Sequence, residues 1–292
     1  MFTLTRARSS ELSLGELVTL SDEAARSKVT LAPERGALVT AFSVAGRELL
    51  YMDEGTLKDP AQNVRGGIPV LFPTPGKVAG DRWQRAGQSG ELKQHGFARN
   101  LPWSVAGEST ESAAAVTLLL TSNAETLARY PWDFRFELTF TLQGGSLRIS
   151  ARVLNTSTRA MPFALGYHPY FLVGDKRSLH IDTRATRAFD NVTKRELPFH
   201  GFDHSAEEVD LHHLDHGSTE SALHLGDASS IRVSGSPDFT RWVVWTKAGK
   251  SFVCLEPWTA PGNAFNTGEA LCSLPPGAEH EAWVEIAWLA RH

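Results

Sequence analysis

Apolar and polar side chains alternate with a period of two along much of the chain. In residues 136–142 (FELTFTL) the alternation is strict, and residues 147–153 repeat it after Gly144-Gly145. A period of two turns one face of a strand toward a core and the other toward water, and two such runs around a Gly-Gly turn form a hairpin. The pattern therefore predicts antiparallel strands.

Further short runs of this kind are separated by Gly, Pro, Asn or Asp. Strands are expected at residues 38–44, 114–121, 178–183, 231–233, 241–246, 251–255 and 282–289. Helical periodicity is limited to one or two turns at residues 21–27 and 125–130. Many strands with few short helices indicate an all-β fold, a large antiparallel β-sandwich. Because no charged or Ser/Gly-rich linker interrupts the chain, we expect a single domain over residues 1–292.

Composition and charge exclude several classes of protein. Hydrophobic residues make up 41% and charged residues 21%, so a substantial core can form. A net charge of −4 offers no field that would attract nucleic acid or an anionic membrane. The two cysteines are too few for a disulfide framework, and neither a signal peptide nor a membrane span is recognisable. We expect a cytoplasmic protein, a monomer or homodimer, without nucleic-acid or membrane partners.

Glu256 and His168 are the two residues best suited to proton transfer. Glu256 follows the apolar run 252–255, where burial would disfavour its charged form and raise its pKa, as a general base near neutral pH requires. A strand-end Glu paired with a surface Arg would look the same in sequence. His168 lies in an aromatic segment, 165–171, and imidazole exchanges protons near pH 7. A packed core histidine is the alternative there, and also for His95.

Two segments break the strand rhythm. Residues 65–81 are dense in Gly and Pro, as expected for an ordered loop that passes close to a site. Residues 200–216 concentrate five histidines among acidic residues. His212 and His216 could join Asp203, His204 or Asp215 around a divalent ion, but their spacing requires a helix, and a solvated polar loop is the simpler interpretation.

Four motifs in order give the chain a family resemblance. They are GGIPVLFP at 66–73, HGFAR at 95–99, GYHPYF at 166–171 and CLEPW at 254–258. In this order and spacing they resemble the aldose 1-epimerase, or galactose mutarotase-like, family over roughly residues 30–290. The resemblance implies a β-supersandwich that interconverts the α and β anomers of an aldose, with neither metal nor cofactor.

The resemblance also implies residue roles. Glu256 would remove the proton from the C1 hydroxyl, His168 would protonate the ring oxygen, and His95 would hydrogen-bond the sugar. An acidic substrate-binding residue is expected upstream, for which Asp210 is preferred to Asp203 on spacing.

The substrate class is open at this stage. Arg65 and Arg99 resemble the hexose-6-phosphate mutarotase branch, where such arginines bind phosphate, whereas GYHPYF and CLEPW look more like branches that act on unphosphorylated aldoses. Either arginine could instead be structural. The substrate is thus a monosaccharide or a sugar phosphate, and a non-catalytic sugar-binding module of the same fold is a further alternative.

Overall fold

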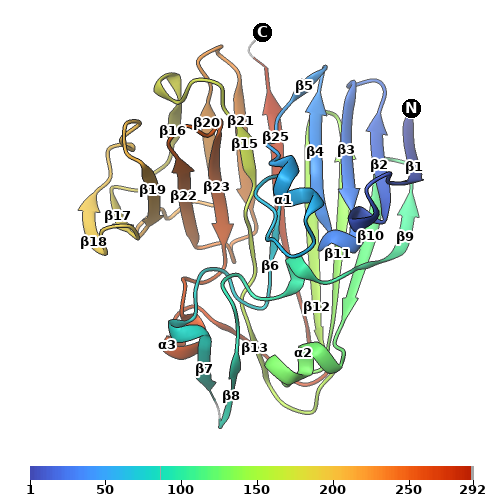
Figure 1. Cartoon of the computed structure of the whole chain (residues 1–292), viewed down its shortest axis with the longest axis vertical. Helices are drawn as coiled ribbons and strands as arrows, with labels where there is room; N and C mark the ends of the chain where they lie inside the picture. The colour runs from blue at the N-terminus through green and yellow to red at the C-terminus, as the bar shows by residue number, and fades with distance from the viewer. Residues whose placement is uncertain (86, 291–292) are drawn as a thin grey trace.

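Two layers of antiparallel strands make up the fold in a computed structural model that describes residues 1–85 and 87–290 (Figure 1). One layer is an eight-stranded sheet, hereafter the long sheet. Its strands run in the order β16 (His180–Asp182), β20 (Glu220–His224), β21 (Ser230–Gly235), β25 (Glu279–Leu289), β12 (Ser146–Asn155), β11 (Phe134–Gln143), β10 (Ala114–Thr121) and β9 (Ser104–Ser109).

The second layer consists of two sheets joined by single bridges. The N-terminal sheet runs in the order β1 (Phe2–Arg8), β2 (Glu16–Asp22), β3 (Ser27–Ala32), β4 (Leu38–Val44) and β5 (Arg47–Glu48). The other, hereafter the site sheet, runs in the order β18 (Arg195–Pro198), β17 (Arg187–Asp190), β19 (Glu208–His213), β22 (Arg241–Lys247), β23 (Phe252–Trp258), β14 (Gly166–Tyr167) and β6 (Val70–Leu71), and β15 (Tyr170–Leu172) also pairs with β23. Bridges such as Val39 to Ile68 and Leu50 to Phe171 connect the two.

Smaller elements close the ends of the sandwich. Strand β13 (Met161–Phe163) pairs with β24 (Cys272–Leu274), and β7 (Arg82–Arg85) pairs with β8 (Gln88–Glu91). The α-helices of the described residues are short: α1 (Glu54–Lys58), α2 (Ala124–Arg129) and α3 (Ala264–Thr267). No helix within residues 1–85 and 87–290 is long and apolar enough to cross a bilayer.

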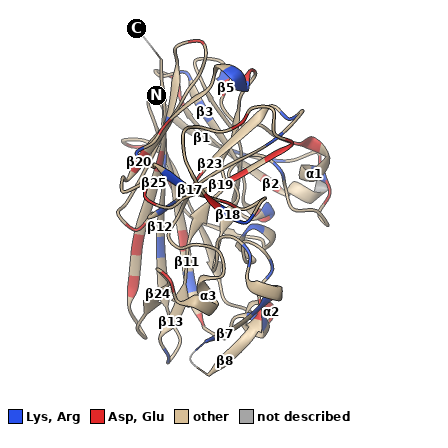
Figure 2. Cartoon of the chain, turned by 90° about the vertical axis from the view of Figure 1, so that its left-hand side faces the viewer, with Lys and Arg blue, Asp and Glu red and all other residues tan. Residues whose placement is uncertain are grey.

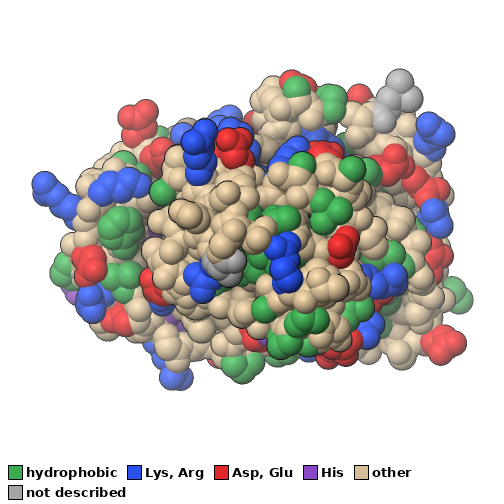
Figure 3. All heavy atoms as spheres, turned by 90° about the horizontal axis from the view of Figure 1, so that it is seen from below, with side chains coloured by type: hydrophobic (Ala, Val, Ile, Leu, Met, Phe, Trp, Pro, Cys, Tyr) green, Lys and Arg blue, Asp and Glu red, His purple; other side chains and the backbone are tan. Residues whose placement is uncertain are grey.

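The period-two pattern sorts the long sheet into a buried and a solvated face. Along β11 every second side chain, from Phe134 to Leu142, is buried, and β12 continues the hairpin in the predicted register. On the outer face Arg152 forms ion pairs with Glu137 and Glu279 on the neighbouring strands. Figure 2 accordingly shows stretches of acidic and basic residues along the ribbon of these strands, and in Figure 3 hydrophobic side chains are scattered over the lower end.

Phe72 ties the Gly- and Pro-rich loop at 65–81 to the core. Its ring is completely buried, and it lies 4.7 Å from the ring of Phe136, 5.3 Å from that of Phe134 and 5.9 Å from that of Phe163. The backbone carbonyl of Phe72 also accepts a hydrogen bond from the Phe97 amide. The loop is thereby held against the segment 95–99 at one edge of the site sheet.

Most predicted strands are confirmed, but one predicted helix is wrong. Residues 125–130 do form a helical turn, α2, which begins at the Asn123 cap. Residues 21–27 instead form the ends of β2 and β3 with a turn between them, and Asp22 pairs with Ser27 across that turn. Pairing between these two strands outweighs the helix propensity of the Glu-Ala-Ala-Arg run.

Candidate active site

Strand register brings His168 opposite Glu256. On the two sides of His168, strands β14 and β15 pair with β23 in one continuous register, Gly166 with Trp258 and Tyr170 with Cys254. Residue 168 of one segment therefore stands across from residue 256 of the other, and Nε2 of His168 lies 3.4 Å from Oε1 of Glu256. The sequence predicted this meeting of an imidazole and a carboxyl group.

Glu256 lies inside strand β23, which continues to Trp258, so the prediction of a strand-end position is wrong. The side chain is 1% exposed, and the indole Nε1 of Trp258 donates a hydrogen bond of 3.1 Å to its Oε2. Burial raises the pKa of Glu256 well above its usual value, and the nearby charge of Asp210 adds to the rise. Its ionisable partner is His168, not a surface arginine.

His168 is enclosed by aromatic rings. It is 7% exposed, its ring stacks on that of Tyr170 at 4.7 Å, and the Trp245 ring stands edge-on at 5.6 Å. Its Nδ1 is buried without a hydrogen-bond partner. Burial, helped by the charge of Arg99, lowers the pKa of His168 to about 3. Burial thus favours a neutral imidazole and a protonated carboxyl group in the resting pair.

The backbone of the 65–81 loop fixes the orientation of His95. The amide of Gly76 donates a hydrogen bond of 3.0 Å to Nδ1 of His95, so a neutral ring carries its proton on Nε2. The ring centre lies 5.5 Å from that of His168 and 5.7 Å from that of Trp258. Burial lowers the pKa of His95 well below its usual value, with Arg99 contributing. His95 therefore places an N–H donor beside the His168–Glu256 pair.

Asp210 lies on the same face of the site sheet as Glu256. Strand β19 pairs Asp210 with Trp245 of β22, and β22 pairs Trp245 with Cys254 of β23. Asn191 donates a hydrogen bond of 2.7 Å to Oδ2 of Asp210. Burial pushes the pKa of Asp210 upward, but hydrogen bonds to its charged form outweigh burial and leave the pKa lowered. Asp210 is therefore a carboxylate at neutral pH.

Asp203, the less preferred alternative, lies on an exposed turn. Its Oδ1 accepts hydrogen bonds from the amide and the hydroxyl of Ser205. The structure thus brings Asp210, and not Asp203, to the face that carries Glu256.

His212 is a site residue that was not predicted as one. Its Nε2 lies 3.1 Å from Oδ1 of Asp210, and its ring stands edge-on to that of Trp258 at 5.3 Å. A strand interpretation of 208–213 would have found it, because residues two apart share a face. The same alternation sends His213 to the opposite face, where it is completely buried near His216.

The hypothetical metal cluster at 203–216 is not formed among the described residues. His212 belongs to a strand and not to a helix, so its spacing to His216 does not align the two rings. Across residues 1–85 and 87–290, the group of side chains that could hold an ion is His168, Cys254 and Glu256.

The two candidate phosphate ligands differ in burial. Arg99 is largely buried: its Nη2 donates to the carbonyl of Gln94 at 2.8 Å, whereas Nε has no partner. Burial lowers the pKa of Arg99 to about 10, against the opposing influence of Tyr170 and Glu256. The Arg65 side chain is exposed. The positive charges of Arg65 and Arg99 both lower the pKa of Tyr170 and partly offset the rise that burial causes. Both arginines therefore lie near Tyr170.

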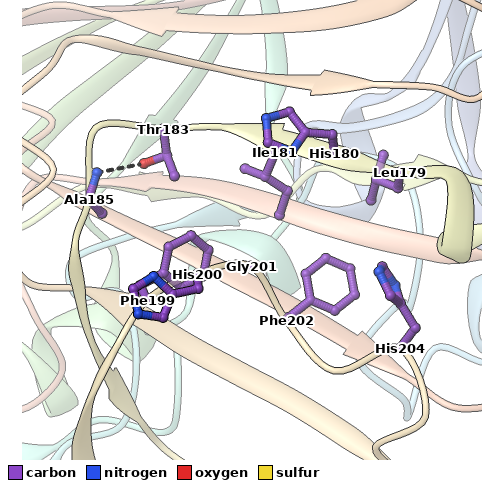
Figure 4. A pocket seen from close by; sticks show the side chains of 10 residues that line it. All are labelled: Leu179, His180, Ile181, Thr183, Ala185, Phe199, His200, Gly201, Phe202 and His204. Carbon is purple, nitrogen blue, oxygen red and sulfur yellow. Dashed lines mark hydrogen bonds between the residues drawn. The ribbon is translucent and has the colours of Figure 1, made fainter.

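A separate cavity of about 460 Å³ lies away from this face, between the segment 179–185 and the segment 199–204 (Figure 4). Phe199 and Phe202 form part of its wall, and the side chains of His180, His200 and His204 are exposed around it. None of its lining residues belongs to the His168–Glu256 site.

Comparisons with known proteins agree on one family. The model of the aldose 1-epimerase family matches residues 16–287. A "putative glucose-6-phosphate 1-epimerase" from Cenchrus ciliaris is 28% identical over 262 residues, which cover 79% of this chain and 76% of the relative.

Solved structures agree with the fold. The Slr1438 protein from Synechocystis sp. PCC 6803 is 36% identical, covers 100% of both chains and superposes with a TM-score of 0.93. A galactose mutarotase-like protein from Clostridium acetobutylicum, at 17% identity and 99% coverage of both chains, has a TM-score of 0.79. The predicted galactose mutarotase-like β-sandwich is confirmed, and the protein is an isomerase that belongs to the aldose 1-epimerase family.

Proposed function

We propose that this protein interconverts the α and β anomers of an aldose with His168 and Glu256 as its proton-transfer pair. The observation that carries the proposal is the 3.4 Å approach of Nε2 of His168 to Oε1 of Glu256 on a face walled by Tyr170, Trp245 and Trp258. Anomerisation needs two titratable groups at one hemiacetal, one holding a proton and the other accepting one.

The reaction is a proton relay around ring opening. Glu256 as carboxylate takes the proton of the C1 hydroxyl while His168 as imidazolium gives one to the ring oxygen, so the bond from C1 to the ring oxygen breaks and a C1 carbonyl forms. Rotation about the C1–C2 bond and closure with the roles exchanged yields the other anomer. Because burial leaves the resting proton on Glu256, it must pass to His168 before ring opening.

His95 and Asp210 serve as substrate-binding residues in this proposal. The Nε2–H of His95 is suited to the sugar ring oxygen, on which negative charge develops as the ring opens. The Asp210 carboxylate is suited to accept hydrogen bonds from sugar hydroxyls, and Asn191 and His212 hold its orientation.

The test is an anomerisation assay with freshly dissolved α-glucose and α-galactose, followed by polarimetry. Glu256→Gln and His168→Asn should each lower turnover by about two or more orders of magnitude, the usual contribution of a general acid or base. Glu220→Gln and His224→Asn, at exposed positions, are the matched controls and should retain full activity. Near-normal turnover in a folded Glu256 or His168 variant would remove that residue from the pair.

A phosphorylated substrate is the second candidate, favoured by one structural observation. The guanidinium of Arg99 is largely buried beside the site with Nε unpartnered, and Arg65 stands exposed near Tyr170. A planar guanidinium can hold two phosphate oxygens at once. The name of the Cenchrus ciliaris relative points the same way. Comparing kcat/KM for free hexoses and hexose 6-phosphates decides between the two substrate classes.

A further inference from the structure

A thiol lies beside the proposed proton-transfer pair. Cys254 and Glu256 are two residues apart on β23, so their side chains share one face, and His168 faces that row from the opposite segment. One potential ligand atom from each of the three residues lies within 4.8 Å of the other two. All three side chains are buried.

We propose that this trio binds a thiophilic divalent cation such as Zn²⁺ or Cd²⁺, and that the bound ion inhibits the enzyme. The binding site follows from the geometry alone, whereas the inhibition rests on the proposed roles of His168 and Glu256.

The ligand set suits such an ion. Thiolate, imidazole and carboxylate are the three donors of protein zinc sites, with bonds of about 2.0–2.3 Å, which puts ligand atoms about 3.3–3.8 Å apart in a tetrahedron. Nε2 of His168 and Oε1 of Glu256 are already 3.4 Å apart. Because the three ligand atoms lie within 4.8 Å of one another, the sulfur or its neighbours must shift by about 1 Å at most to reach tetrahedral spacing. Three protein ligands leave a fourth position for water or a sugar hydroxyl.

Charge balance is compatible with a cation bound in this buried site. A thiolate and a carboxylate together carry two negative charges, which a divalent ion neutralises, so the complex avoids the cost of burying net charge. Coordination deprotonates the thiol directly, even though burial raises the pKa of Cys254. His168 retains 7% exposure and marks the side on which an ion can enter.

Inhibition follows from what the ion replaces. With the metal on Nε2 of His168 and on a carboxylate oxygen of Glu256, neither group can give or take a proton. The expected effect of a metal is therefore opposite to that in a metalloenzyme: added cation abolishes turnover and a chelator restores it.

The chain contains two cysteines, which provides a matched control. Purified, metal-free protein would be titrated with Cd²⁺ alone, and the ultraviolet charge-transfer band of a cadmium–thiolate bond would be recorded. We expect the band to saturate at one equivalent of Cd²⁺ in the wild type and in Cys272→Ser, and to be absent from Cys254→Ser. In parallel, anomerisation would be measured with Zn²⁺ and then with excess chelator. Cys254→Ser should retain basal activity and require at least about tenfold more Zn²⁺ for half-inhibition, the factor that corresponds to about 1.4 kcal/mol.

The outcomes separate the two proposals. A band that is absent from the wild type, or that survives in Cys254→Ser and disappears in Cys272→Ser, overturns the metal site. Inhibition of the wild type and of Cys254→Ser at the same Zn²⁺ concentration overturns it as well. A Cd²⁺ band at Cys254 that leaves turnover unaffected upholds the metal site but contradicts the proton-transfer roles of His168 and Glu256. Near-ultraviolet circular dichroism of both variants checks that the fold is retained.

Discussion

Acidification should destabilise the fold through a histidine outside the active site. His213 is completely buried on the core side of β19, where its ring lies 4.5 Å from that of Phe199 and its Nε2 has no hydrogen-bond partner. The charge of Asp215 favours a charged imidazolium there, but burial outweighs it. Burial, with a further contribution from His216, lowers the pKa of His213 to about 3.

The magnitude follows from the difference between the folded and unfolded pKa. Unfolded histidine titrates near pH 6.5, so the stability that neutral His213 contributes is complete above that pH and is lost as the pH falls toward the folded value. At about pH 5, roughly 1.5 pH units below the pKa of unfolded histidine, this histidine is protonated in the unfolded chain but still neutral in the folded chain. At about 1.4 kcal/mol per unit this costs about 2 kcal/mol.

Urea denaturation at about pH 7.5 and about pH 5 measures this loss. His213→Phe keeps an aromatic ring in the core but removes the titrating imidazole. On going from the higher to the lower pH, the free energy of unfolding of this variant should therefore fall by about 2 kcal/mol less than that of the wild type. His224→Phe, at an exposed position, is the control and should behave as the wild type. An equal loss in His213→Phe and the wild type would refute the reasoning.

Further substitutions test the site and the core. Asp210→Asn should lower kcat/KM by roughly 10- to 100-fold, as expected for removal of a charged hydrogen bond of about 1.5–3 kcal/mol, whereas Asp203→Asn should leave steady-state kinetics unchanged. If the substrate carries a phosphate, Arg99→Gln and Arg65→Gln should each lower kcat/KM for hexose 6-phosphates by about tenfold or more and leave free hexoses unaffected; equal losses on both substrates would indicate a structural role. Phe72→Ala should cost about 3–5 kcal/mol in the free energy of unfolding, read as a lower Tm, because it empties the centre of an aromatic cluster; an unchanged Tm would contradict that position.

Period-two alternation predicted the long central strands because their two faces differ so sharply. The β11–β12 hairpin is confirmed in register, with core and solvent sides as expected. The same signal is present in β2 and β3, where Val18, Leu20, Val29 and Leu31 are buried, but the charged residues between these strands favoured a helical interpretation. Local propensity could not reveal that the two strands pair.

The site was predictable in its chemistry and less so in its geometry. The motifs identified His168, Glu256 and His95, which the structure brings together. Placing His212 required knowing that 208–213 is a strand, since a helix would have sent its side chain elsewhere. The burial of Arg99 depends on how the 95–99 segment packs against the loop at 65–81, which no local pattern encodes.

The shared register of β14 and β15 against β23 limits where this chain can change length. Both strands pair with β23 in the same register, although Pro169 between them has no amide hydrogen to donate to a backbone hydrogen bond. One residue inserted or deleted within 166–170 or 254–258 would turn either His168 or Glu256 to the opposite side of its strand. Insertions in the connecting loops leave this parity intact, so variation in length can accumulate there while these two short segments stay fixed in size.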